Sequence, residues 1–273
     1  MKRILDYSLL FTTVGVMGMA CENPPPKRPG SLKDTTIQNP VVVSLKEQIR
    51  QHPDSIRLYD KLIDQYTADK NYNAAMAWCD SLLKQNPDLN FSYWLVKGKL
   101  QRQALLFDSA ISSYKAYLQR FPDDEEALLN MANAAAEGGK KESLGMSDAM
   151  IQRSGTKEVR ADGYFIKGVY FSRIKEFDKA IENFNQSIVN RYSFWEAYLE
   201  KAIAQYDQQE FEKSLATLHE LLQVDPSYAD AYYWQGKCYE ALHQKSEALK
   251  NYDAAYGLDK TYIDAKEKAD SLR

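Results

Sequence analysis

Apolar and polar residues alternate in a pattern that repeats about every 34 residues from residue 56 to residue 262. In each unit, apolar residues recur at spacings of three and four over two successive stretches, with polar residues between them. This spacing places the apolar side chains on one face of each of two helices. Prolines keep the same period and lie where a helix should end, because the proline ring cannot continue it. They are Pro53, Pro87, Pro122 and Pro226.

The repeated unit resembles the tetratricopeptide repeat, which prefers Trp, Gly, Tyr, Ala, Phe and Ala at places 4, 8, 11, 20, 24 and 27. The last unit has Tyr232, Gly236, Tyr239, Ala248, Tyr252 and Ala255 at these places. The small residues at places 8 and 20 should let the paired helices approach closely, and the aromatic residues should fill the space around them. The resemblance implies an all-α fold, a right-handed superhelix (α-solenoid) of about six helical hairpins.

Six copies are expected, and terminal helices should cap them within a solenoid domain at residues 44–273. A helix at Ser44–Gln51 should precede the first copy, and a capping helix at 263–272 should close the stack. The third copy is the weakest, because Gly138, Gly139 and Gly145 should loosen its second helix. The copies cover residues 56–89, 91–124, 125–160, 161–194, 195–228 and 229–262.

The N-terminal segment has the layout of a secretory signal. Lys2 and Arg3 precede an apolar run, and small residues follow before Cys21. The stretch at 18–21 resembles the lipobox of bacterial lipoproteins, although Gly18 stands where that family prefers Leu. The resemblance implies a signal peptide at 1–20 and lipidation of Cys21. Cleavage into a free secreted protein and retention of the segment as a helical anchor stay as alternatives.

A proline-rich segment, residues 21–43, follows the signal. Its prolines and charged residues cannot bury a core, so a semi-extended tether is expected between the lipid and the folded domain. By resemblance to lipoprotein sorting signals, Glu22 after the lipidated cysteine favours the bacterial outer membrane. A lipoprotein with a periplasmic or surface-facing domain is the resulting expectation.

Charge and motifs narrow the classes of function. A net charge of −3 gives no basic footprint for nucleic acid. The three histidines lack the spacing of a zinc site, and the chain has no phosphate-binding loop, nucleophile elbow or paired-cysteine motif. Cys79 and Cys238 fall at interior places of distant copies and should be buried and unpaired. Four carboxylates at 123–126 should begin a helix, where they favour its dipole. We therefore expect no enzyme, no metal site and no cofactor.

The resemblance implies a binding groove lined by the first helix of each hairpin, at places 2, 5, 9, 12 and 13. An apolar stripe is expected along this groove, and its alternative is that these side chains pack against neighbouring copies. A clamp for a terminal carboxylate is not expected, because only Asn133 occupies a clamp-like place. The groove candidates are Leu95, Lys99, Arg102, Leu129, Asn133, Phe165, Val169, Arg173, Leu199, Ile203, Tyr206, Tyr233 and Lys237.

Two classes of function follow from this pattern. The first is a non-catalytic scaffold or adaptor, lipid-anchored in the cell envelope, that holds a segment of a partner protein in the groove. The second is a solute or glycan receptor lipoprotein in which the repeats support a small-molecule site, since tyrosines can stack on sugars. The identity of the partner does not follow from the sequence.

Overall fold

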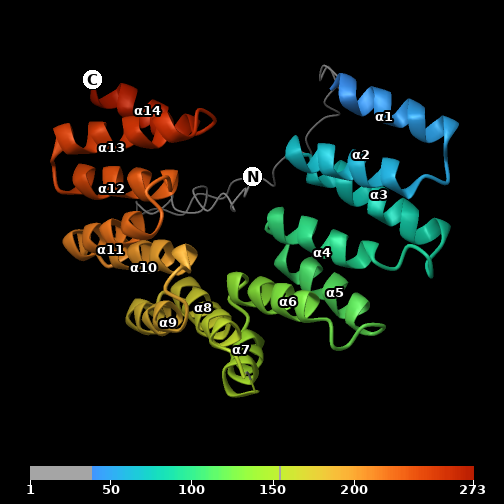
Figure 1. The fold of residues 1–273 in the computed structure, drawn as a ribbon, viewed down its shortest axis with the longest axis horizontal. Helices are drawn as coiled ribbons and strands as arrows, with labels where there is room; N and C mark the ends of the chain where they lie inside the picture. The colour runs from blue at the N-terminus through green and yellow to red at the C-terminus, as the bar shows by residue number, and fades with distance from the viewer. Residues whose placement is uncertain (1–38, 154) are drawn as a thin grey trace, which may run out of the picture. The chain divides into compact units, whose positions relative to one another are not determined.

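The computed structural model describes residues 39–153 and 155–273. The expected signal peptide at 1–20, the lipidation site Cys21 and the tether up to residue 38 lie outside the described residues. Within the described part, the chain is all-α, with fourteen helices and no strands (Figure 1). The all-α prediction is therefore confirmed.

The helices form hairpins in chain order, each with a first and a second helix. Six hairpins stand between the terminal helices α1 (Pro40–Gln51) and α14 (Ile263–Leu272). They are α2 (Ile56–Ala68) with α3 (Tyr72–Gln85), α4 (Tyr93–Gln103) with α5 (Phe107–Leu118), α6 (Glu125–Glu137) with α7 (Glu142–Arg153), α8 (Lys157–Arg173) with α9 (Phe177–Asn190), α10 (Trp195–Asp207) with α11 (Phe211–Val224), and α12 (Ala229–Ala241) with α13 (Lys245–Leu258).

The chain divides into two units between Tyr93 and Trp94. In the first unit, α1 packs on α2, and α2 packs on α3. The Tyr93 hydroxyl closes this unit by donating to Asp60 Oδ1 at 2.8 Å. The second unit holds the remaining hairpins, and in it α6, α8, α10 and α12 contact one another in succession. These are the first helices of the last four hairpins.

The N-terminal helix begins earlier than the pattern predicts. It starts at Pro40 rather than Ser44, so residues 40–43 are helical and do not belong to the tether. Proline is tolerated at this position because the first N–H groups of a helix have no partner within it. Asn39 caps the helix, since its side chain accepts a hydrogen bond from the Val41 amide at 3.0 Å. Val42, Leu45 and Ile49 are buried and anchor the helix.

Every hairpin turn uses the same backbone device. The residue at place 15 adopts a left-handed conformation, with φ between 55° and 64°. The next residue donates its N–H to the carbonyl five positions back, at 2.8–2.9 Å, which is the Schellman arrangement at a helix C-terminus. Gly139 is thus the turn residue of the third hairpin. The six left-handed residues are Lys70, Leu105, Gly139, Lys175, Gln209 and His243.

Close approach of the paired helices depends on glycine at place 8. A Cβ atom built on Gly168 would lie 2.5 Å from the Phe184 ring, and one on Gly98 would lie 2.5 Å from the Tyr114 ring. The third such pair is Gly236 and Tyr252, at 2.7 Å. Each ring occupies the space that a side chain at place 8 would fill, as the sequence predicts.

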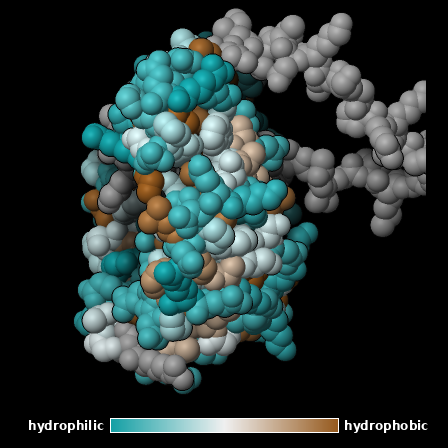
Figure 2. Space-filling model, turned by 90° about the vertical axis from the view of Figure 1, so that its right-hand side faces the viewer, coloured by the Kyte–Doolittle hydropathy of each residue, from teal (hydrophilic) through white to brown (hydrophobic). Residues whose placement is uncertain are grey.

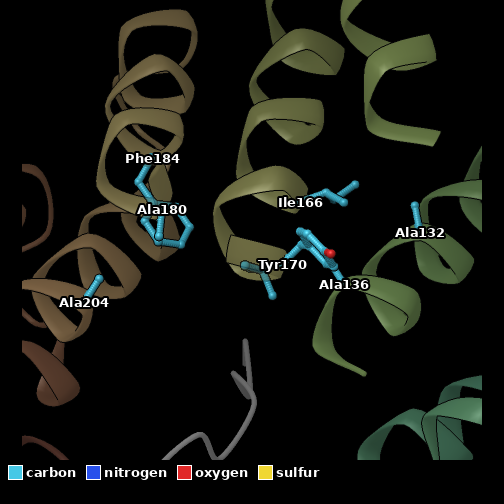
Figure 3. Packing of buried hydrophobic residues seen from close by; sticks show 8 residues of the cluster. Ala132, Ala136, Ile166, Tyr170, Ala180, Phe184 and Ala204 are labelled. Atoms are coloured by element: carbon cyan, nitrogen blue, oxygen red, sulfur yellow. The ribbon is translucent and has the colours of Figure 1, made fainter. Parts of the chain in front are cut away.

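The core of the second unit is continuous through α8. Figure 3 shows Ile166 and Tyr170 of α8 directed toward Ala132 and Ala136 of α6. Ala180 and Phe184 of α9 belong to the same cluster, with Ala204 of α10 on their far side (Figure 3). Alanine recurs in this cluster because neighbouring helix axes can approach only where side chains are small. The third hairpin joins this core through α6.

The third hairpin is more regular than its glycines predict. Its second helix, α7, runs without interruption through Gly145. The extra residues of this copy appear in α8, which begins at Lys157, four residues before the predicted start at 161, and which Thr156 caps. The predicted loosening of this helix is therefore wrong. Ser143 and Ser147 are buried on α7 and donate to carbonyls in the preceding turn, while Leu144, Met146 and Met150 pack against the core.

The cysteine prediction is confirmed. Cys79 and Cys238 are both buried and free of a disulfide. Burial raises the pKa of the Cys238 thiol to about 11, and this thiol donates to the Ser214 hydroxyl at 3.3 Å. A reactive cysteine needs a lowered pKa, so Cys238 has the character of a core residue.

Candidate functional site

The groove face of the second unit differs from the predicted apolar stripe because aromatic side chains cover place 5. Phe194 lies on Phe165 with ring centroids 4.8 Å apart, and Tyr262 stacks on Tyr233 at 4.9 Å. Both covering residues stand at place 34, in the turn after the second helix of the same hairpin. Leu199 occupies place 5 between these two pairs and is buried as well.

Place 9 is buried where it carries an apolar residue. Val169 belongs to the core cluster around α8, and Ile203 is only 4% exposed. The expectation of a solvent-facing stripe is therefore wrong for Val169, Leu199, Ile203 and Tyr233, which are all buried. These four side chains pack within the stack of hairpins, which was the alternative to a solvent-facing stripe. Leu95, Leu129, Phe165 and Tyr206 keep partial exposure.

Charged side chains form most of what remains accessible on this face. Lys99 of α4 pairs with Glu126 of α6. Arg102 forks onto the Glu137 carboxylate with three hydrogen bonds of 2.8–3.1 Å and also donates to Asn130 at 3.2 Å. The Glu137 side chain is only 4% exposed, so this pair is buried and hydrogen-bonded across two hairpins. Arg102 therefore has a structural partner at the predicted groove.

Arg173, Glu200 and Asp207 continue the charged series on α8 and α10. Burial raises the pKa of the Glu200 carboxyl to about 7. Arg173 opposes this shift, and Glu137 and Asp207 add to it. Burial likewise raises the pKa of Asp207 to about 6, against the attraction of Lys237 and Lys175. Asp207 Oδ2 is buried and accepts no hydrogen bond from the described residues. Both carboxyls are held in places that disfavour their charge.

A pH dependence of stability follows for Glu200. Its carboxyl takes up a proton near pH 7 in the folded chain and near pH 4.5 in an unfolded one. Between these values the folded state binds the extra proton, so stability falls as the pH rises through this window. Relative to Glu200→Gln, the wild-type protein should gain about 2 kcal/mol of unfolding free energy when the pH is lowered from about 8 to about 5. Urea titrations of both proteins at each pH measure this, and parallel pH profiles would contradict it.

Lys237 and Asn133 are held by neighbours of the same unit. The Lys237 ammonium lies 3.8 Å from the centroid of the Trp234 ring and 4.9 Å from that of Tyr206. Desolvation lowers the pKa of this ammonium. The Asn133 amide donates to the Leu129 carbonyl at 3.0 Å, so its oxygen is the group that faces away from the helix backbone. Both residues remain partly exposed.

The sequence interpretation places Glu137 and Asp207 on this face and misses Glu200. Glu137 and Asp207 stand at place 13 of their copies, and Glu200 stands at place 6. The pairing of Glu137 has a signal in the sequence, because Arg102 carries the opposite charge about one period earlier. No local pattern marks Glu200, whose surroundings come from three different helices.

The face drawn in Figure 2 is mostly hydrophilic. Figure 2 shows hydrophobic residues as small, separated patches among hydrophilic ones. A shallow depression of ≈ 590 Å³ lies on α8 and α9, lined by Tyr164, Lys167, Phe171, Lys179, Glu182, Asn183 and Gln186. Within residues 39–153 and 155–273, no helix is long and apolar enough to cross a bilayer. The same residues hold no cluster of metal-ligating side chains.

Comparison with known proteins places the repeats on two stretches of the second unit. The profile of the tetratricopeptide repeat family matches residues 95–143 and 199–263. The tetratricopeptide repeat and J domain-containing co-chaperone DNJ1 of Fusarium oxysporum f. sp. lycopersici is 33% identical over 93 residues. That match covers 31% of this chain and 17% of the co-chaperone, so the chain spans a small part of that protein.

Solved structures show the same fold at low identity. A tetratricopeptide repeat protein from Parabacteroides merdae ATCC 43184 superposes with a TM-score of 0.64 and 16% identity. The superposition covers 85% of this chain and 90% of that one. A thermophilic tetratricopeptide repeat protein of Thermus thermophilus gives a TM-score of 0.55 at 16% identity, covering 66% of this chain and 96% of that one. These likenesses concern the packing of the helices.

Proposed function

We propose that this chain is a non-catalytic adaptor built from tetratricopeptide repeats, because the profile of that family matches two of its stretches and such proteins are generally protein–protein interaction scaffolds. In this proposal the groove face of α4, α6, α8, α10 and α12 holds a segment of a partner protein. Binding there is polar, with the partly exposed aromatic side chains as local apolar contacts.

One observation carries this proposal. The first helices of successive hairpins present charged and amide groups that remain partly exposed beside a buried apolar row. A surface of this kind offers many hydrogen-bonding groups to an extended chain, and repeat folds use such extended surfaces for binding. The residues concerned are Lys99, Arg102, Asn133, Arg173, Asp207 and Lys237.

The proposal includes attachment to the cell envelope. Support comes from the charged and apolar leader, from Cys21 with small residues before it, and from the proline-rich segment that follows. The chain would then be an outer-membrane lipoprotein whose repeats face the periplasm or the cell surface. Replacing Cys21 by alanine should move the protein from the membrane fraction to the soluble envelope fraction. Unchanged fractionation of Cys21→Ala would refute the lipid anchor.

The groove assignment can be tested by site-specific photo-crosslinking in the full-length chain. A photoreactive residue at Asn133, Arg173 or Lys237 should give a discrete adduct with one partner, because these side chains are partly exposed on the groove face. Matched controls place the same residue at exposed positions of second helices, Lys115, Asn185 and Gln223. Adducts that form equally well from both sets, or from neither, would refute groove binding.

The depression on α8 and α9 favours a receptor as the second candidate. Tyr164 and Phe171 offer aromatic faces beside the amides of Asn183 and Gln186, which is the chemistry that sugars use. The Lys179 ammonium lies 5.3 Å from the Phe171 ring centroid and therefore covers part of this aromatic face within the depression. Thermal stabilisation by an oligosaccharide, lost in Phe171→Ala, would favour this function over the adaptor.

A further inference from the structure

One strip of the groove face holds two buried polar atoms that need a partner. We define the α10–α12 strip as the groove face of these two helices. Tyr228, which lies beside the first residue of α10, marks one end of the strip, and Asp207, the last residue of α10, marks the other. The Tyr228 hydroxyl and Asp207 Oδ2 are both buried and have no hydrogen-bond partner within the described residues. The Tyr228 side chain is 6% exposed and lies against Trp195, the first residue of α10, with ring centroids 5.1 Å apart. Asp207 is the last residue of the same helix.

Burying polar atoms without partners costs free energy, and native proteins keep few of them. The equivalent hydroxyl of the next hairpin has a partner. Tyr262, at the same place in the next hairpin, hydrogen-bonds to Asp230, whereas the preceding hairpin has Phe194 at this place and therefore no hydroxyl. The Tyr228 hydroxyl therefore lacks an interaction that the Tyr262 hydroxyl has. A ligand group is one way to supply it.

Carboxylates outnumber cations around the strip. Burial is the main cause of the raised pKa of the Tyr228 hydroxyl. The nearby carboxylates of Glu196, Glu200, Asp225 and Asp230 raise this pKa further. Asp264 and Glu240 act on Tyr233 in the same direction. The cations that face these groups are Arg173, Lys175, Lys237 and Lys268, and Lys268 already pairs with Glu240 at 3.1 Å. The strip is thus complementary to positive charge.

The aromatic residues beside Asp207 already accommodate a cation. The Lys237 ammonium lies over Trp234 and Tyr206, and the rings of these two residues are 5.4 Å apart at an interplanar angle of 73°. A second cation placed here would meet ring faces and a carboxylate oxygen that has no donor. Aromatic faces and carboxylates together bind arginine and lysine side chains well.

We propose, on the basis of the adaptor function above, that the α10–α12 strip binds an extended partner segment that carries lysine or arginine. The thirteen residues of α10 are about 18 Å long, which an extended segment of about six residues spans. A basic side chain of the segment pairs with Asp207 at one end. A polar group of the segment meets the Tyr228 hydroxyl at the other.

A random library of displayed peptides of about ten residues, each about 33 Å long when extended, tests the chemistry of the segment on the full-length chain. Enrichment of lysine and arginine among the bound peptides, lost in Asp207→Asn, is the expected result. Enrichment of acidic or apolar peptides would overturn this inference and leave the adaptor function standing. No enrichment over a library exposed to empty support would overturn both.

Substitutions in the strip locate the binding. With a fluorescein-labelled peptide of alternating arginine and serine, Asp207→Asn should weaken the Kd by about tenfold or more, since a buried charge pair is lost. Glu220→Gln removes one exposed carboxylate from α11 of the same unit and should change the Kd less than twofold, about the effect of a distant screened charge. Equal weakening by both variants would show general charge attraction and overturn the proposal.

Tyr228→Phe separates a ligand-binding role from a structural one. Removing a buried hydroxyl that has no partner should leave the melting temperature unchanged or raise it. The same change should weaken binding of the arginine–serine peptide by about fivefold, the value of about one hydrogen bond. A variant that melts like the wild-type protein and binds the peptide equally well would remove Tyr228 from the site. The corresponding peptide of glutamate and serine should not bind.

Discussion

Replacing Gly168 by alanine is expected to destabilise the protein by about 3 kcal/mol, even though alanine is the better helix former. The added Cβ atom would lie 2.5 Å from Cδ1 and Cε1 of Phe184, whose side chain is fully buried. The ring has no free space to enter, so α8 and α9 must move apart and lose their contact. Urea unfolding followed by far-UV circular dichroism measures the loss.

Gly145 of α7 is the matched control. It also lies within a helix, but a Cβ atom there would meet nothing within 4 Å. Gly145→Ala should therefore stabilise the protein by up to about 1 kcal/mol through helix propensity alone. Shortening the opposing side chain in Gly168→Ala/Phe184→Leu should recover part of the lost stability. If Gly168→Ala and Gly145→Ala changed the unfolding free energy in the same direction, steric contact at Gly168 would not be the cause.

Replacing Arg102 by methionine should cost about 3–5 kcal/mol, because it removes the guanidinium that pairs with the buried Glu137 carboxylate. The Glu137 side chain is 4% exposed and accepts three hydrogen bonds from this one guanidinium. Methionine keeps much of the volume of the arginine stem, so lost packing contributes little. Thermal or urea unfolding of the variant gives the difference.

Two further variants show whether charge is the cause. Arg102→Met/Glu137→Leu removes both charges and should recover most of the lost stability, since an apolar pair can replace a buried ion pair. Lys99→Met breaks the neighbouring pair with Glu126, whose side chains are 41% and 60% exposed, and should cost less than about 1 kcal/mol. An Arg102 variant no less stable than the Lys99 variant would contradict the buried-pair account.

The groove face shows which properties of a residue its place in the repeat predicts and which it does not. The pattern places Phe165, Leu199 and Tyr233 on the first helices at equivalent places. It does not show that Phe194 and Tyr262 stack on two of them, because those residues stand about 29 positions later in the chain. The contact between these distant residues forms only in the tertiary structure. It converts a predicted apolar surface into a core and leaves the charged groups as the accessible part.

This shift changes the expected chemistry of binding. An apolar stripe would hold a partner by burial of hydrophobic side chains. The polar face observed here would select a partner by charge. The Tyr228 hydroxyl and Asp207 Oδ2, which have no hydrogen-bond partner among the described residues, would then bind polar groups of that partner. Substituting Ile203 by aspartate is consequently a poor test of binding, because this residue is only 4% exposed and the variant would lose stability first.

The sequence by itself determined the helical hairpins, their period and the small residues between paired helices. These features depend on local spacing, on proline and on the volume of single side chains, all of which can be read along the chain. Only the tertiary structure decided which groove residues are covered and why the Glu200 carboxyl titrates near pH 7. Both depend on groups from several helices that meet in space, where burial and neighbouring charges set the free energy of each side chain.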